Sequence, residues 1–338
     1  MRIIKTTVKR ILLPFFEGYF RLRMVWPVWK YGVNMRPNRL WESEKRELGG
    51  VAARIVRDLE ENGIAIAHCD EFFPDNKMLE ELKAYAEVLQ REKTDRVVAK
   101  EKVSKPFLMN LFEPTPVINF QNPFHSFALY PNIVDIVNAY FGLYAKLYYL
   151  TLNITLPVGS GAAAIASQRW HRDPEDRRMC KVFLYLNDVD ETAGPFMYAA
   201  KSCYGLKYGS LFPQKPPIGA YPDVSTLEKT IDKEDVKVCT GRVGTIIFCD
   251  TSGLHKGGYA TAKERVMFTA GYRTNGAVTP NRIRYPENYR EKLSAMKFSP
   301  AAQYAAAPFT VSALNRKLFS YVMRWREEIG GRATYHEG

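Results

Sequence analysis

The sequence predicts a mainly β protein with flanking helices, whose one closed or sandwiched all-β core lies in residues 146–275. Two observations predict this class. Short runs rich in β-branched and aromatic residues follow one another there, among them KLYYLTLNITLP, KVFLYLNDV, GTIIFCD and RVMFTAGYR. On both sides of this region, apolar residues recur at helical spacing instead. Many short strands in succession are typical of a closed or two-sheet core.

Residues 1–40 are expected to form a basic amphipathic segment. They hold nine Lys or Arg against Glu17 alone, which makes +8 of the chain's +12, so the rest contributes only +4. Apolar residues such as Ile11, Phe15 and Tyr19 recur at helical spacing. Pro14 should break that helix into two short segments. Two alternatives stay open: the segment packs on the body, or it makes peripheral contact with an anionic membrane.

Residues 41–145 are predicted to be a helical and loop part that packs on the core. Helices are expected at 41–62, where Gly63 ends the first of them, at 75–93 and at 133–141. A strand, GIAIAHC, follows the first helix. Residues 94–130 are rich in proline and predict loops near the mouth of the core. A C-terminal helical extension, residues 276–338, is expected to contain a final amphipathic helix at 311–329.

The run QRWHRDPEDRRMC carries candidate metal ligands. His171 and Asp173 are two residues apart, so on an extended chain their side chains point to the same side. A metal bound there needs a third ligand, and His255 is the obvious donor. Two histidines and one carboxylate with open positions suit non-haem iron(II) and oxygen chemistry. Arg265 opens a strand-like run ten residues later, where a guanidinium suits the distal carboxylate of a dicarboxylate co-substrate.

Three segments carry a family resemblance: WHRDPEDRRMCKVFLYLNDVDETAGPFMYAAKS, GRVGTIIFCDTSGLHKGG and ERVMFTAGY. They resemble the phytanoyl-CoA dioxygenase family, closely over residues 146–274 and more loosely over GIAIAHCDEFFPDNKMLEELK. The resemblance implies a double-stranded β-helix of the jelly-roll or cupin-like kind. It also implies an iron(II)- and 2-oxoglutarate-dependent dioxygenase that uses O2. By the same resemblance, Asn153 on the first strand of the core helps to hold the co-substrate.

The implied reaction is hydroxylation, or desaturation, of an unactivated C–H bond in a small organic substrate, with succinate and CO2 as co-products. No side chain is required as a general base, so the sequence names no catalytic residue of that kind. The carboxylate of Asp173 favours these reactions over halogenation, because halogenating relatives replace it with a small residue. Two other classes stay open: a cupin-like metal-binding protein or isomerase without oxygen activation, and a degenerate, membrane-bound scaffold.

Composition bears on partners and compartment. Five cysteines without CxxC spacing are predicted to be small buried hydrophobes, and a reducing, cytoplasmic location follows from that reading. The near-neutral body lacks any DNA- or RNA-binding motif, so no nucleic-acid partner is expected. The sequence leaves the identity of the small-molecule substrate open. Residues 94–130 and the loop Lys201–Asp235 are predicted to shape its pocket, the latter through Tyr204, Tyr208, Phe212 and Tyr221.

Overall fold

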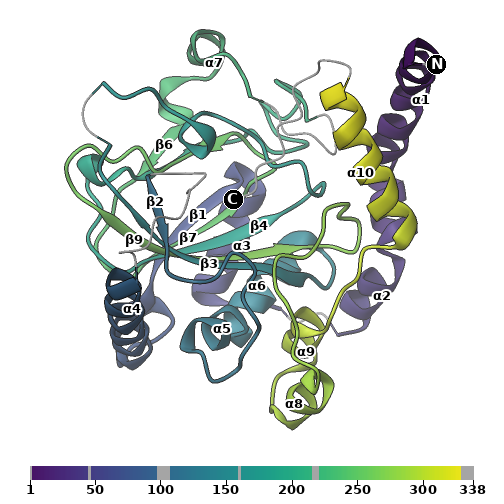
Figure 1. Ribbon diagram of the computed structural model, residues 1–338. Coiled ribbons are helices and arrows are strands. Elements are labelled where there is room, and N and C mark those ends of the chain that lie inside the picture. Colours follow the sequence, from purple (N-terminus) through teal and green to yellow (C-terminus); the bar gives the residue numbers. More distant parts are fainter. Residues whose placement is uncertain (1, 45–46, 97–106, 159–160, 215–220, 329–338) are drawn as a thin grey trace.

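The structure is a computed structural model that describes residues 2–44, 47–96, 107–158, 161–214 and 221–328 (Figure 1). Its strands form two antiparallel sheets. The larger sheet has the order β1-β7-β4-β9-β3-β2, made of β1 (Ile64–His68), β2 (Leu108–Asn110), β3 (Lys146–Thr155), β4 (Cys180–Tyr185), β7 (Thr245–Asp250) and β9 (Arg265–Arg273). The smaller sheet has the order β6-β5-β8, made of β5 (Phe196–Ala199), β6 (Val236–Cys239) and β8 (His255–Lys256).

The predicted fold class is right about the strands and wrong about the proportion of strand to helix. Every strand run quoted from residues 146–275 forms a strand. Among the described residues, however, the two sheets do not close into a barrel, since neither end strand of the larger sheet, β1 or β2, pairs with the smaller one. Helices also hold more residues than strands do, so the fold combines antiparallel sheets with a large helical part.

Helices cover one face of the larger sheet. They are α3 (Gly50–Asn62), α4 (Lys77–Arg96), α5 (Pro123–Ala128) and α6 (Pro131–Phe141). Their apolar side chains share one hydrophobic core with Leu150, Leu152 and Phe268 of the sheet. Because strand side chains alternate, Thr151 and Asn153 point to the opposite face, where they line a cavity between the two sheets.

The helix predicted at 41–62 is two helices, α2 (Met35–Glu44) and α3. Residues 47–49 before α3 are not helical, and residues 45–46 lie outside the described part. Gly63 ends α3 as predicted, with a φ of +76° in the left-handed region. The remaining helices are α7 (Val224–Thr230), α8 (Tyr289–Ala295), α9 (Pro300–Ala306) and α10 (Ala313–Glu328). All five cysteines are buried free thiols, so their prediction as small buried hydrophobes is confirmed.

The first helix, α1 (Arg2–Arg23), runs unbroken through Pro14, so the predicted break into two segments is wrong. Pro14 and Arg10 are both exposed. Water can therefore bond the Arg10 carbonyl that the proline leaves without a donor. The inner side of α1 packs on α10 and on the residues after β9, through Leu13 and Phe20, and this confirms the packing alternative for that side.

The segment after α1 is anchored next to QRWHRDPEDRRMC, the run that carries the candidate ligands His171 and Asp173 (the ligand run). Trp29, in a short π-helical turn (Val28–Val33), is fully buried, and its indole donates to Asp176 Oδ1 at 2.7 Å. Asp176 Oδ2 accepts from the backbone N–H and the hydroxyl of Thr274, just after β9. The buried carboxylate thus joins residues 1–40 to two distant parts of the chain.

We predict that Trp29→Phe lowers the free energy of unfolding by about 1–3 kcal/mol, because it removes one donor from a buried carboxylate while keeping most of the apolar volume. Urea denaturation measures the change. The matched control is Trp41→Phe, at a half-buried indole that packs on Tyr144. An equal loss in both variants would show that ring size rather than the hydrogen bond matters.

Candidate metal centre

A backbone pairing brings the two candidate histidines together. The N–H of each donates to the carbonyl of the other at 3.0 Å, which makes His171 and His255 an antiparallel bridge. His255 begins β8, and His171 forms an isolated bridge with it outside the named strands. The imidazole centroids lie 4.2 Å apart. Residues far apart in the chain therefore sit opposite each other at the smaller sheet.

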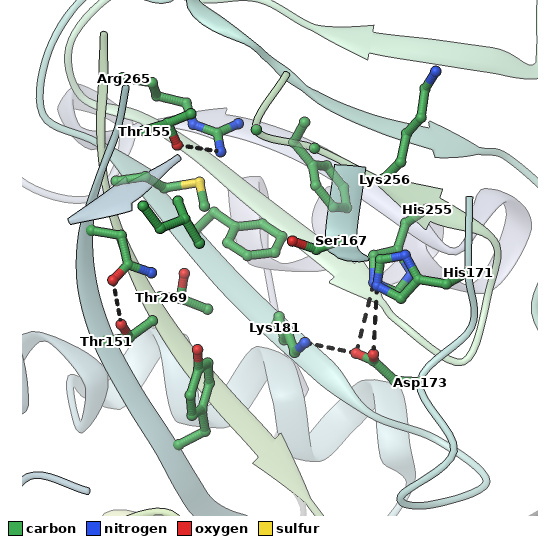
Figure 2. A pocket seen from close by; sticks show the side chains of 18 of the residues that line it. Thr151, Thr155, Ser167, His171, Asp173, Lys181, His255, Lys256, Arg265 and Thr269 are labelled. Atoms are coloured by element: carbon green, nitrogen blue, oxygen red, sulfur yellow. Dashed lines mark hydrogen bonds and ion pairs between the residues drawn. The ribbon is translucent and has the colours of Figure 1, made fainter. Parts of the chain in front are cut away.

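Asp173 completes the cluster. Its N–H donates to the Thr251 carbonyl at 3.0 Å, which keeps its backbone beside the segment that leads to His255. The carboxylate oxygens lie 3.9 Å from His171 Nε2 and 3.7 Å from His255 Nε2. All three side chains are buried, and one donor atom from each lies within 4.8 Å of the others (Figure 2). The three donors can converge on one metal ion; that they are its ligands stays a prediction.

Both candidate histidines are held in the neutral form, with Nε2 toward the cluster. The Nδ1 atoms lie within hydrogen-bond distance of the Arg169 carbonyl (2.8 Å) and the Gly253 carbonyl (3.0 Å). An Nδ1–H that donates to these carbonyls leaves Nε2 with its lone pair toward the cluster. Burial, the largest cause in each case, lowers the pKa of His171 to about 3 and that of His255 to about 4. Neither ring needs to lose a proton at neutral pH to bind a metal.

A lysine that the sequence reading missed contacts the candidate carboxylate ligand. Lys181, on β4, places its ammonium 2.6 Å from Asp173 Oδ2. Burial would raise the pKa of Asp173, but the Lys181 ammonium and the two imidazoles outweigh it, so the pKa lies below its ordinary value. Nearby Glu175 has its pKa raised to about 7 by burial and by Asp173. Without a metal, the lysine is therefore the main partner of the Asp173 charge.

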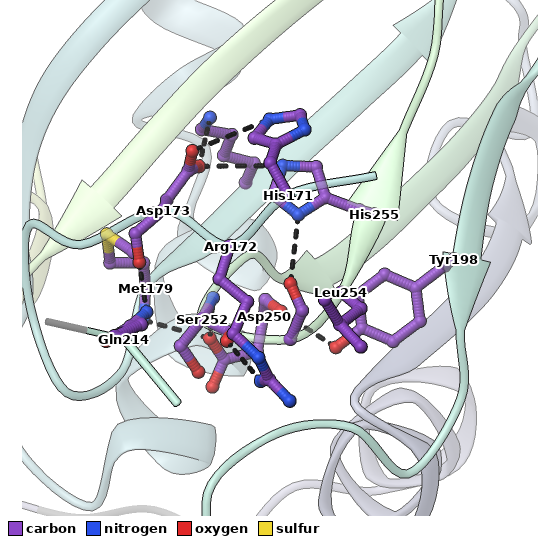
Figure 3. Close-up of polar contacts among 12 residues, drawn as sticks. His171, Arg172, Asp173, Met179, Tyr198, Gln214, Asp250, Ser252, Leu254 and His255 are labelled. Atoms are coloured by element: carbon purple, nitrogen blue, oxygen red, sulfur yellow. Dashed lines mark hydrogen bonds and ion pairs between the residues drawn. The ribbon is translucent and has the colours of Figure 1, made fainter. Parts of the chain in front are cut away.

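Arg172 holds the ligand run from behind (Figure 3). It points away from the cluster, as strand alternation predicts, and its buried guanidinium donates to four backbone carbonyls: those of Ser202, Tyr208, Leu211 and Ser252. Gln214 donates to the Asp173 carbonyl from the same loop. These bonds fix the backbone between His171 and Asp173 against the segment after β5.

One cavity between the sheets contains the cluster and the other two candidate site residues (Figure 2). Asn153 lines it from β3 and accepts a hydrogen bond from Thr151 at 2.9 Å. Arg265 lines it from β9 and is 3% exposed. The structure thus places all five candidate site residues along one space, whose walls also include Phe107, Tyr148, Tyr149, Phe183, Phe196 and Met267.

Arg265 has no acidic partner among the described residues. Its guanidinium donates to the Gly194 carbonyl at 2.6 Å and to Thr155 Oγ1 at 3.1 Å, and its Nε has no hydrogen-bond partner in the part of the chain that the structure describes. No carboxylate of the described residues lies within 4.0 Å of it. A buried cation that faces a cavity in this way is suited to an anion that enters the cavity.

The predicted pocket loops need correction. Phe107 and Leu108, from the 94–130 region, line the cavity, whereas no described residue of the loop Lys201–Asp235 does. Tyr208 is buried away from the cavity, and its carbonyl accepts from Arg172. Tyr221 instead stacks against the His171 ring at 5.7 Å. Residues 97–106 and 215–220 lie outside the described part of the chain.

Sequence reasoning also missed Thr155, Glu175 and Arg282, which line the cavity with Lys181. A signal existed for Lys181, since a single lysine begins the otherwise apolar run KVFLYL. Thr155 continues the alternation of Tyr149, Thr151 and Asn153 by one step, so the same pattern could have found it. Nothing local marks Arg282, which follows the last strand.

No protein-family model matches the chain, and no curated protein sequence matches it. Solved structures give weaker likenesses. The epimerase SnoN, in complex with Fe3+, alpha ketoglutarate and nogalamycin RO, is 15% identical over 68% of this chain and 86% of that chain, with a TM-score of 0.47. EctD from S. alaskensis with bound Fe is 15% identical over 73% and 86%, with a TM-score of 0.48. The non-heme monooxygenase ThoJ is 15% identical over 80% and 99%, with a TM-score of 0.47.

These neighbours include two structures that hold iron and one that also holds 2-oxoglutarate, under the name alpha ketoglutarate. Identities of 15% with TM-scores below 0.5 do not decide the reaction of this chain. The resemblance to the phytanoyl-CoA dioxygenase family therefore stays an expectation.

We predict that Lys181→Met binds divalent metal more tightly than the parent chain, by about tenfold or more. The substitution removes a cation that repels the metal and competes for Asp173. Its metal-free form should unfold at a lower temperature, because Asp173 is left buried without its main partner. Isothermal titration with cobalt(II) and thermal unfolding with and without metal measure both effects.

Lys181→Arg is the matched control, since it keeps a cation beside Asp173 and should change the cobalt(II) affinity little. Unchanged or weaker cobalt(II) binding by a folded Lys181→Met protein would contradict competition between the ammonium and the metal.

Proposed function

We propose that the protein is an iron(II)- and 2-oxoglutarate-dependent oxygenase that acts on a small organic substrate. The observation that carries this proposal is the buried Arg265, without an acidic partner among the described residues, in the same cavity as the donor set of His171, Asp173 and His255. Three protein ligands leave three octahedral positions open. Bound there, iron(II) and 2-oxoglutarate supply the oxidation of the substrate, with succinate and CO2 as co-products.

In this proposal the chain's own residues bind, orient and exclude water. Arg265 pairs with the distal carboxylate of 2-oxoglutarate, while its bonds to Thr155 and the Gly194 carbonyl set the plane of the guanidinium. Asn153 contributes an amide to the same region. The aromatic walls, such as Phe107 and Tyr149, keep the cavity dry around the reacting atoms.

We further propose that the core is a double-stranded β-helix of the phytanoyl-CoA dioxygenase kind. The order of the motifs supports this: His171 to Asp173 comes first, then Gly194 to Phe196, and then His255 and Arg265. The cavity between two antiparallel sheets supports it as well. The carboxylate of Asp173 at the second ligand position favours hydroxylation or desaturation over halogenation.

The competing class, a cupin-like metal-binding protein or isomerase without oxygen activation, accounts for the ligand set but gives no role to Arg265. A metal site that takes no dicarboxylate has no need of a buried guanidinium facing the same cavity. Dependence on 2-oxoglutarate therefore separates the two classes.

We predict that Arg265→Ala weakens 2-oxoglutarate binding by about 2–5 kcal/mol, the usual loss when one partner of a buried charge pair is removed. Anaerobic calorimetric titration of the iron(II)-loaded protein measures it. Arg265→Lys should bind 2-oxoglutarate with an affinity between those of the parent chain and Arg265→Ala, because an ammonium keeps the charge but not the two-pronged geometry. The matched control is Arg169→Ala, at an exposed arginine beside the ligand run. Full 2-oxoglutarate affinity in folded Arg265→Ala protein would reject this role.

We predict one iron(II) per chain and succinate formation that requires it. His171→Ala and Asp173→Ala should each abolish iron binding and turnover, while circular dichroism shows a retained fold. Turnover is measured with a metabolite extract, by the succinate formed and by products heavier by one oxygen atom or lighter by two hydrogens. Succinate formation that survives stringent chelation, or that persists in Asp173→Ala, would overturn the iron assignment.

A further inference from the structure

The first helix has two apolar faces, and only one of them is covered. On the inner face, Leu13 and Phe20 are buried against Val278 and Val322. On the outer face, Phe15 is 71% exposed, and Ile11 is 59% exposed. α1 lies at the edge of the molecule beside α10 (Figure 1). The body of the protein therefore covers the inner apolar face of this helix and leaves the outer one exposed.

The exposed residues form one continuous stripe. Val8, Ile11, Leu12, Phe15 and Leu22 are separated by three, one, three and seven positions, which places them on one side of an α-helix. The helix continues through Pro14, so the stripe is not divided. Scattered exposed apolar residues need no explanation, but an aligned row on one helix face indicates a contact surface.

Basic side chains lie on the flanks of α1, between this stripe and the inner face. Arg10 and Arg21 are exposed on one flank of α1, and Lys9 lies on the other flank, where it pairs with Glu328 of α10. The one acidic residue of α1, Glu17, is buried on the inner side, where it pairs with Arg326 at 2.6 Å and lies 4.0 Å from Arg21. Residues 1–40 together carry +8. The outer face is thus apolar, and the basic residues of α1 lie on the flanks beside it.

We propose that this outer face of α1 docks the protein on an anionic membrane surface, with the helix lying in the plane of the interface. An apolar stripe with basic residues on the flanks of the helix is the pattern of interfacial helices, whose apolar side enters the lipid while the cations stay at the headgroups. A second copy of the chain fits less well, because two segments of +8 would face each other. Among the described residues, no helix is both long and apolar enough to span a bilayer, so the contact is peripheral. The proposal is independent of the proposed function.

Point substitutions on the outer face test the proposal without disturbing the inner one. Deletion of the segment would be uninformative, since it also removes Phe20 and Trp29 from the core. The full chain is sedimented with vesicles of phosphatidylcholine alone or with about 30% phosphatidylserine. We expect Ile11→Ser combined with Phe15→Ser to weaken binding to the anionic vesicles by at least about tenfold, with an unchanged unfolding temperature. Ile66→Ser combined with Val224→Ser, at exposed apolar residues elsewhere, is the matched control and should bind like the parent chain.

The charges are tested separately. Arg10→Gln combined with Arg21→Gln should weaken binding to the anionic vesicles, and about 0.5 M salt should weaken that of the parent chain. If Ile11→Ser combined with Phe15→Ser lowers the unfolding temperature, vesicle binding by the Arg10→Gln and Arg21→Gln protein is the measurement that tests the proposal. No sedimentation at low salt, or equal binding to neutral and anionic vesicles, would overturn the proposal. So would a concentration-dependent dimer that the Ile11→Ser and Phe15→Ser protein no longer forms, because the stripe would then be covered by a second copy.

Discussion

The reciprocal backbone pair between His171 and His255 is the constraint on which the rest of the site depends. Each residue gives its N–H to the other's carbonyl, so the two imidazoles are set by strand register rather than by flexible side chains. The Asp173 bond to Thr251 continues the same alignment. A slip by one residue would turn the ligands to the other side of the sheet, because strand side chains alternate. Arg172 opposes such a slip by tying the ligand run to four carbonyls behind it.

Local patterns were enough to predict most strands and the convergence of the candidate ligands. Strand alternation places Tyr149, Thr151 and Asn153 on the cavity face of β3, and motif order pointed to His255 as the partner of His171 and Asp173. What the sequence could not supply depends on contacts between distant segments. Lys181 reaches Asp173 only because β4 lies under the ligand run, and the path of the loop after β5 is decided by the carbonyls that Arg172 binds. Pro14 misled the prediction because a proline on the solvent side of a packed helix is tolerated.

Two buried arginines show how the same residue type takes different roles. Arg172 and Arg265 are almost fully buried, and neither has a carboxylate within 4.0 Å among the described residues. Arg172 directs its terminal nitrogens to four backbone carbonyls and stays out of the cavity, so its charge is already solvated by the protein. Arg265 donates to one backbone carbonyl, that of Gly194, and to the Thr155 hydroxyl, and it faces the cavity. Burial alone therefore does not identify an arginine that binds a ligand. Such an arginine has few hydrogen-bond acceptors from the protein and an open cavity in front of its guanidinium.

The packing of α1 on α10 also has a consequence for synthesis on the ribosome. From Arg23, where α1 ends, to Ala313, where α10 begins, the ribosome adds 290 residues. At about 5–20 residues per second, this takes roughly 15–60 s. During that time the inner face of α1, with Leu13 and Phe20, lacks Val322 of α10, which packs against it in the folded protein. The apolar contact that completes the inner face of α1 therefore forms only near the end of synthesis, when α10 has emerged.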